Sequence, residues 1–133
     1  MSHYVDITLK ITDKQALARA LGRLGFSTVE VHETAQSLYG YKGDERQQKA
    51  HVILRRRFVG SASNDIGFEF RDGTCIAHIS EYDQGSMNYN EDWRSKVNTW
   101  YGYEKALSET KLKGYRFKEE LDEKQRPRLR VFV

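Results

Sequence analysis

The chain has 133 residues, of which 38% are apolar, 31% are charged and 12% are aromatic, and its formal net charge is +3. This length matches one compact domain of about 100–150 residues, and the aromatic content excludes a disordered chain. The sequence has neither a basic-then-apolar leader nor an apolar run near the roughly 20 residues of a membrane-spanning helix, so we expect residues 1–133 to form a single soluble, cytoplasmic domain.

The positive charge lies in the C-terminal third. Residues 1–85 contain 11 basic and 11 acidic side chains, whereas residues 86–133 contain 11 and 8. A nucleic-acid-binding domain normally has a basic face with few acidic residues on it. Because Asp and Glu are interleaved with Lys and Arg in almost every segment, charge by itself does not favour such a domain.

The first two elements are a strand and a helix. Residues 4–11 alternate between polar and apolar side chains, as in a half-buried strand. In "TDKQ", Thr12 and Gln15 have the spacing of a capping box that begins a helix, and Gly25 ends that helix. Its apolar face has three leucines, Leu17, Leu21 and Leu24.

The middle of the chain is rich in strands. The segments "STVEVH" and "KAHVILRR" are expected strands on either side of a polar connection, "YGYKGDERQQ". After the loop "VGSASND", the segment "IGFEFRDGTCIAHISEY" has the pattern of two antiparallel strands around a turn at Asp72 and Gly73.

The C-terminal third contains a long helix over residues 91–113 and a closing hairpin of "YRFKEEL" and "RPRLRVFV". The helix has a broad aromatic face, which we expect to pack with the leucines of the first helix: Trp93, Val97, Trp100 and Leu107. The order strand, helix, four strands, helix, two strands predicts an α+β fold. We expect a single antiparallel sheet of about six to seven strands with both helices on one face.

The sequence contains no catalytic motif. Cys75 and His78 are three residues apart on an expected strand, so their side chains point to opposite faces and cannot share a proton. The single cysteine has no CxxC partner, His32 and His51 are isolated, and Asp65 is explained as a loop cap. We expect no catalytic residue, no metal site and no cofactor, with Cys75 in the core.

Three consecutive arginines, Arg55, Arg56 and Arg57, follow the strand segment "HVIL". Strand alternation would place one of them on the apolar face, where an unpaired guanidinium is too costly. We therefore expect regular pairing to end near Arg55 or Arg56, with Arg56 and Arg57 projecting into solvent at the rim of the sheet. A phosphate or acidic-partner contact is the alternative.

A second basic stretch lies on the last strand. Four basic residues share one face of it: Lys124, Arg126, Arg128 and Arg130. They have the spacing of a phosphate-binding ladder. If Leu121 lies opposite Leu129, however, Glu120 faces Arg130. Asp122 then faces Arg128, and the ladder is explained by cross-strand ion pairs.

The connections between the strands carry the side chains that are enriched at protein interfaces, namely tyrosine, methionine and arginine. We expect a partner-binding surface made of seven residues: Tyr39, Tyr41, Lys42, Arg56, Arg57, Met87 and Tyr89. The alternative is that Tyr39 and Tyr41 only cover the edge of the sheet.

Seven stretches also resemble a known family: "MSHY", "ALARALGRLGF", "YGYKG", "KAHVILR", "DIGFEF", "YGYEKAL" and "GYRFKEE" with the final strand. Spread over nearly the whole chain, they resemble the plastid and cyanobacterial hypothetical-reading-frame family thirty-five, also catalogued as domain of unknown function twelve fifty-seven. The resemblance implies a small soluble α+β protein found in cyanobacteria, plastids, other bacteria and phages. It implies no established activity, cofactor or catalytic residue.

The sequence departs from that family in the arginine run, in "FVGSASN" and in "EYDQGSMNYNED", which favours a phage or heterotrophic bacterial origin. The occurrence of relatives near genes for an AAA-type ATPase suggests an adaptor. We expect a non-enzymatic binding protein, an adaptor or inhibitor, that contacts another protein and no membrane. The alternative is a nucleic-acid or nucleotide-binding module that uses Arg55 and the basic residues of the last strand.

Overall fold

The computed structural model describes residues 2–132. The two ends of the expected domain, Met1 and Val133, lie outside the described residues. The strands are β1 (Tyr4–Leu9), β2 (Glu30–Tyr39), β3 (Glu45–Leu54), β4 (Ile66–Arg71), β5 (Thr74–Ser80), β6 (Arg116–Leu121) and β7 (Pro127–Phe132). The helices are α1 (Lys14–Arg23), α2 (Arg56–Val59), α3 (Glu81–Gly85) and α4 (Glu91–Leu112).

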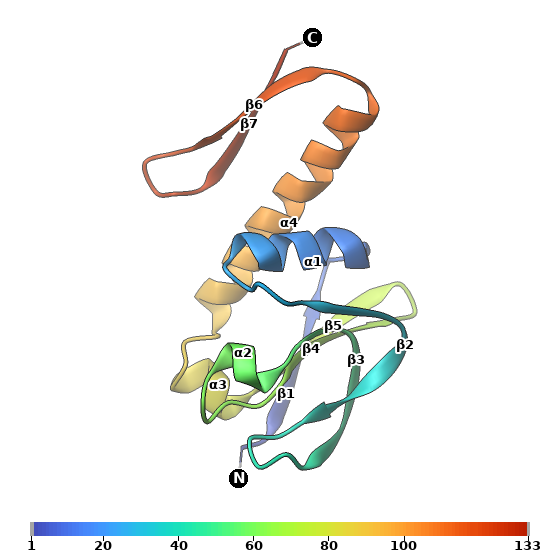
Figure 1. Cartoon of the computed structure of the whole chain (residues 1–133), viewed down its shortest axis with the longest axis vertical. Coiled ribbons are helices and arrows are strands. Elements are labelled where there is room, and N and C mark those ends of the chain that lie inside the picture. The colour runs from blue at the N-terminus through green and yellow to red at the C-terminus, as the bar shows by residue number, and fades with distance from the viewer. Residues whose placement is uncertain (1, 133) are drawn as a thin grey trace.

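The strands form two sheets (Figure 1). Five of them make an antiparallel sheet in the order β1-β5-β4-β3-β2, and β6 pairs only with β7 among the described residues. The α+β class is confirmed, but the expected order lacked the short helices α2 and α3, and the expected single sheet is wrong. The reason is the length of α4, which at 22 residues spans about 33 Å and carries the terminal hairpin away from the first sheet.

The main core lies between one face of the five-stranded sheet and the two long helices. Its fully buried members include Leu17 and Leu21 of α1, Phe68 of β4 and Val97 of α4, while Trp93 packs against them from the edge. The two helices therefore lie together on one face, as expected. Trp100 is not part of this core, because α4 leaves the sheet beyond Val97 and its next turns contact α1 and the hairpin instead.

Tertiary contacts set the beginning of α1. The N-cap residue is Asp13, whose carboxylate accepts a hydrogen bond from the Ala16 amide at 3.1 Å, so the expected capping box of Thr12 and Gln15 is wrong. The amides of Thr12 and Asp13 both donate to the Tyr101 hydroxyl of α4 at 3.1 Å. The chain therefore turns into the helix one residue later than the local pattern predicts.

A smaller core lies apart from the main one, where the β2–β3 hairpin bends. Leu38, Ala50 and Ile53 are buried there with Tyr4 against them. The bend coincides with register shifts between β2 and β3, as β-bulges produce. Gly67 of β4 lies directly beneath this cluster, and a Cβ atom on it would be 2.5 Å from Ala50 Cβ and 2.8 Å from Leu38 Cδ2.

Gly67→Ala should therefore destabilise the protein by about 1–3 kcal/mol, because neither neighbour can move without opening the small core. Gly102→Ala is the matched control, since Gly102 lies inside α4 with open space around its Cα and alanine is the better helix former by about 1 kcal/mol. Urea unfolding of both variants measures the two effects. Equal stability of Gly67→Ala and the unsubstituted protein would contradict this packing.

Candidate functional site

The arginine run marks the end of β3. The strand ends at Leu54, and Arg55 is the extended residue that precedes α2. Regular strand pairing therefore stops just before the three arginines, which confirms the expectation that it ends near Arg55 or Arg56. The three arginines then have different environments: the Arg55 side chain is 24% exposed, Arg56 is half-buried and Arg57 is exposed.

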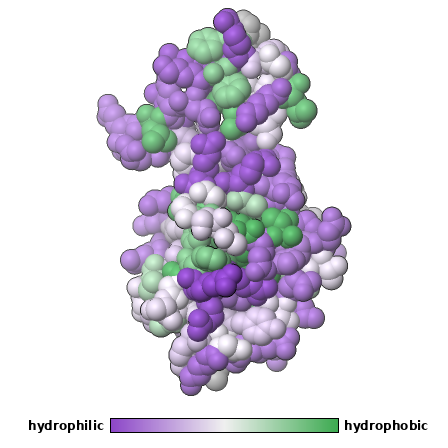
Figure 2. Space-filling view, in the orientation of Figure 1, coloured by the Kyte–Doolittle hydropathy of each residue, from purple (hydrophilic) through white to green (hydrophobic). Residues whose placement is uncertain are grey.

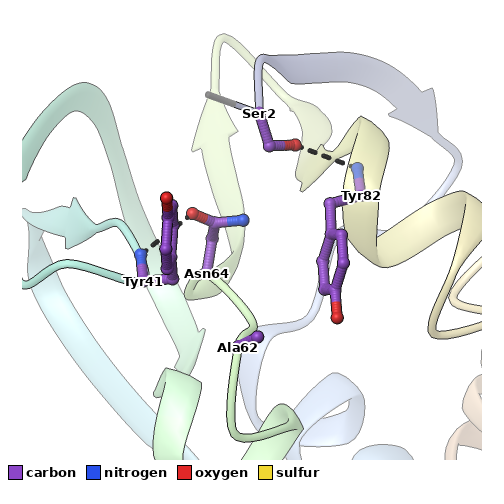
Figure 3. A pocket seen from close by; sticks show the side chains of 5 residues that line it. All are labelled: Ser2, Tyr41, Ala62, Asn64 and Tyr82. Carbon is purple, nitrogen blue, oxygen red and sulfur yellow. Dashed lines mark hydrogen bonds between the residues drawn. The ribbon is translucent and has the colours of Figure 1, made fainter.

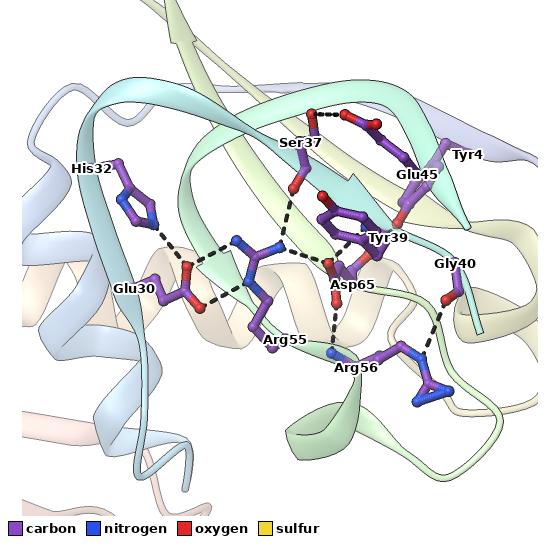
Figure 4. A network of polar contacts seen from close by, with 10 residues as sticks. All are labelled: Tyr4, Glu30, His32, Ser37, Tyr39, Gly40, Glu45, Arg55, Arg56 and Asp65. Carbon is purple, nitrogen blue, oxygen red and sulfur yellow. Dashed lines mark hydrogen bonds and ion pairs between the residues drawn. The ribbon is translucent and has the colours of Figure 1, made fainter. Parts of the chain in front are cut away.

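Arg55 lies between two carboxylates (Figure 4). Its Nε and Nη2 donate to the two Glu30 carboxylate oxygens at 2.8 and 3.0 Å, and its Nη1 donates to Asp65 Oδ2 at 2.9 Å and to the Ser37 carbonyl at 3.0 Å. The hydrogen bond from Arg55 is the main cause that lowers the pKa of Glu30, and His32 adds to it. All three guanidinium nitrogens of Arg55 are thus engaged by groups of this chain.

Asp65 is the buried centre of this network, with a side chain only 1% exposed. Its Oδ1 accepts a hydrogen bond from the Arg56 amide at 2.7 Å, and its Oδ2 accepts one from the Tyr39 amide at 2.8 Å. Its carbonyl accepts a hydrogen bond from the Tyr4 hydroxyl at 2.6 Å. Asp65 thus joins β1, β2 and α2 to the start of β4, which is a larger role than the loop cap we expected.

An exposed surface of aromatic and basic side chains lies over this network. Tyr39 and Tyr41 are 40% and 38% exposed. The Arg56 guanidinium donates to the carbonyls of Gly40 and Tyr41, so the expectation that Arg56 projects freely into solvent is wrong. Both carbonyls belong to the β2–β3 turn, where Gly40 also accepts a hydrogen bond from the Gly43 amide at 2.8 Å. Arg57 does project outward, with its guanidinium carbon 4.8 Å from the Phe58 ring centroid.

A small pocket of about 300 Å³ adjoins Tyr41 (Figure 3). Tyr82 of α3 forms its opposite wall, and Ser2, Ala62 and Asn64 complete it. The Asn64 Oδ1 accepts a hydrogen bond from the Tyr41 amide at 3.1 Å, and the Ser2 hydroxyl accepts one from the Tyr82 amide at 2.9 Å. A second, more open hollow lies beside Tyr39 and the three arginines.

Tyr82 belongs to this surface, and sequence reasoning missed it by extending the preceding strand. α3 begins at Glu81, because the Ser80 hydroxyl caps the helix by accepting a hydrogen bond from the Asp83 amide at 3.1 Å. The Asp83 carboxylate is buried and accepts hydrogen bonds from the Asn64 amide at 3.0 Å and from the Ser80 hydroxyl at 2.7 Å. The sequence contains a pattern that could have predicted this helix, since Ser80 and Asp83 have the spacing of a helix N-cap.

The other three residues of the expected partner surface differ in how exposed they are. Lys42 is exposed, with its ammonium 5.6 Å from the Tyr41 ring centroid, and Met87 is half-buried. Tyr89 faces inward: its hydroxyl donates to the Val59 carbonyl at 3.2 Å and its ring contacts Trp93 edge-on at 5.0 Å. The structure therefore brings Tyr39, Tyr41, Lys42, Arg56 and Arg57 together and places Tyr89 at the edge of the main core.

The basic residues of the last strand do not form a continuous ladder. The observed register places Leu121 opposite Pro127 and Glu120 opposite Arg128, so the expected pairing of Leu121 with Leu129 is wrong by two residues. The turn causes this shift in register. The Asp122 carboxylate accepts hydrogen bonds from the amides of Lys124 and Arg126, and the loop that it closes is shorter than the one we expected. Arg126 Nε is 2.7 Å from Asp122, and Arg130 Nη2 is 3.4 Å from Glu120.

The residues considered for catalysis are separated. Cys75 is in the main core, where burial raises the pKa of its thiol to about 12. His78 lies on the opposite face of the sheet, and its Nδ1 and Nε2 are 2.7 and 2.9 Å from Asp6 and Glu69. Between residues 2 and 132, the structure has no cluster of three or more His, Cys, Asp or Glu side chains suited to a metal ion. No helix in that range is long and apolar enough to cross a membrane.

Arg55→Ala should destabilise the protein by on the order of 3 kcal/mol, because it leaves the Asp65 carboxylate buried without a cation. Arg57→Ala is the matched control and should change stability by less than about 0.5 kcal/mol, since its side chain is exposed. Chemical denaturation measures both. Similar losses for the two variants would contradict the assignment of Arg55 as the structural arginine.

The Glu30 carboxylate predicts a loss of stability in acid. Its pKa is lowered from the ordinary value of 4.5 in the folded state, so its contribution is present above that value and is lost as the pH falls through the folded pKa. Unfolding free energies measured from pH 7 downward should show a gap between Glu30→Gln and the unsubstituted protein that narrows below pH 4.5. A gap that stays constant with pH would show that the charge of Glu30 makes no contribution.

The chain was compared with known families, curated proteins and solved structures. A family model described as "Protein of unknown function (DUF1257)" matches residues 20–130. No curated protein and no solved structure shows a significant match. The match begins within α1 and ends within β7, so it leaves out β1 and covers the other four strands of the larger sheet. This chain therefore belongs to the DUF1257 family of proteins of unknown function.

Proposed function

We propose that this protein is a non-enzymatic cytoplasmic adaptor or inhibitor that binds another protein through a tyrosine rim, made of Tyr39, Tyr41, Tyr82, Arg56 and Arg57. The observation that supports this most strongly is the exposure of three tyrosines, 36–40% each, directly above a buried polar network. Tyrosine and arginine are the side chains most enriched among residues that dominate binding energy.

The rigidity of the rim also favours binding. Asp65 and Arg56 hold the backbone on both sides of Tyr39 and Tyr41, and Asn64 holds the Tyr41 amide. A surface that is ordered before binding loses less conformational entropy when a partner arrives. The pocket between Tyr41 and Tyr82 could then receive one partner side chain, with the tyrosine rings as apolar walls.

The charges near the rim favour a protein over a nucleic acid. Arg57 and Lys42 are exposed, but Asp44 and Glu81 are exposed nearby on the adjoining turn and helix. Phosphate backbones are bound by faces from which acidic side chains are largely missing. A mixed face of this kind suits the polar edge of a protein interface.

The test begins with capture of a partner from the native host and measurement of its affinity with purified proteins. Tyr41→Ala combined with Tyr82→Ala should weaken binding at least tenfold, because residues of this type each contribute more than about 1 kcal/mol at interface centres. Tyr115→Ala is the matched control: Tyr115 is equally exposed, at 38%, but precedes the terminal hairpin.

Unchanged affinity of the double variant, with an intact circular dichroism spectrum, would contradict the tyrosine rim as the binding surface. A salt titration separates the alternative function. If the captured material is nucleic acid, the logarithm of its affinity will fall steeply with the logarithm of salt concentration.

A further inference from the structure

A groove of about 590 Å³ lies between the tip of the terminal hairpin, the end of α1 and the first half of α4. Six of the residues that line it define the basic groove: Arg23, Lys96, Trp100, Leu121, Lys124 and Arg126. They come from the end of α1, the first half of α4 and the β6–β7 turn. The basic groove has no residue in common with the tyrosine rim.

The lining of the basic groove has four cationic side chains and no carboxylate among the described residues. Arg23 is engaged from behind by Glu119 at 2.9 Å and Glu104 at 3.4 Å, and Arg126 by Asp122 at 2.7 Å. Within residues 2–132, Lys96 and Lys124 form no ion pair. Two ammonium groups on opposite walls are therefore available to an acidic occupant.

The basic groove also has apolar walls. Trp100 is half-buried, with the Arg23 guanidinium carbon 5.4 Å from its ring centroid and Tyr103 edge-on at 5.5 Å. Leu121 is 54% exposed at the hairpin tip. Hydrophobic side chains are visible at the surface of the hairpin in Figure 2, separated from those of the main body by a hydrophilic belt. An occupant with both an apolar side chain and negative charges would satisfy both features.

We propose that the basic groove binds an acidic polypeptide segment of a partner protein, in which leucine or phenylalanine is flanked by aspartate and glutamate. The apolar side chain lies against Trp100 and Leu121, and the flanking carboxylates reach Lys96 and Lys124. A nucleic acid is less well matched, because the cations surround an apolar floor instead of forming a row.

The test uses a fluorescein-labelled peptide in which leucine and phenylalanine alternate with glutamate and aspartate, and measures its binding by anisotropy. Lys96→Glu combined with Lys124→Glu should weaken binding at least tenfold. Lys10→Glu combined with Lys49→Glu is the matched control, because it makes the same change in net charge at two exposed lysines outside the groove. Its affinity should change less than threefold. Equal losses in both variants would overturn the proposal, since attraction would then depend on net charge alone.

Trp100 reports on the position of the peptide. The chain has two tryptophans, so Trp93→Phe leaves Trp100 as the single tryptophan, whose emission is selected by excitation at long wavelength. The unlabelled peptide should shift its emission in a saturable way, and a peptide with serine in place of leucine and phenylalanine should bind at least tenfold more weakly. No saturable binding, or tighter binding of an oligothymidine strand than of the acidic peptide, would overturn the proposal. None of these outcomes depends on Tyr41 or Tyr82, so they are independent of the tyrosine rim.

Discussion

The structure around the tyrosine rim depends on one buried ion pair, between Asp65 and Arg55. Removing a carboxylate from water costs several kcal/mol unless charge and hydrogen bonds replace its hydration. Here Arg55 supplies the charge, and the amides of Tyr39 and Arg56 supply two hydrogen bonds. The same contacts end β3, begin α2 and hold the edge of β2. The exposed tyrosines keep their positions because the chain beneath them has no other way to satisfy Asp65.

The second constraint is the length of α4. A two-stranded hairpin is marginally stable by itself, so β6 and β7 require the end of this helix as a support. The hydroxyl of Tyr103 donates to the Glu119 carboxylate at 2.6 Å, and Arg23 of α1 contacts the same carboxylate. These polar contacts hold the hairpin beside both helices and leave a groove between them. The groove is thus a consequence of connecting two small sheets by one straight helix.

The two surfaces that we propose as binding sites differ in how the chain holds them. The tyrosine rim lies on backbone that a buried network holds in place, whereas the basic groove lies where the tip of the terminal hairpin faces α1 and α4. A chain with two separate binding surfaces can bring two segments of one partner, or two partners, together. The second contact then occurs at a high effective concentration. Cys75 is buried in the main core, and His78 lies between Asp6 and Glu69 on the other face of the sheet.

The sequence by itself determined the strands, the two longer helices and their order, because strand alternation and helical spacing are local properties, but it did not indicate the short helices α2 and α3. It also placed the end of β3 at the arginines, since three successive charges cannot alternate into an apolar face. Tyr39, Tyr41 and Arg57 were identified in advance as surface residues for a similar reason: no periodicity in their segments requires burial. Only the tertiary structure decided that Arg55 is structural, that Tyr82 joins the rim and Tyr89 leaves it, and that the hairpin forms its own sheet with a shifted register. Each of these depends on which partner atoms, far apart in the sequence, satisfy a buried charge or a free hydrogen-bonding group, and local patterns carry no information about those partners.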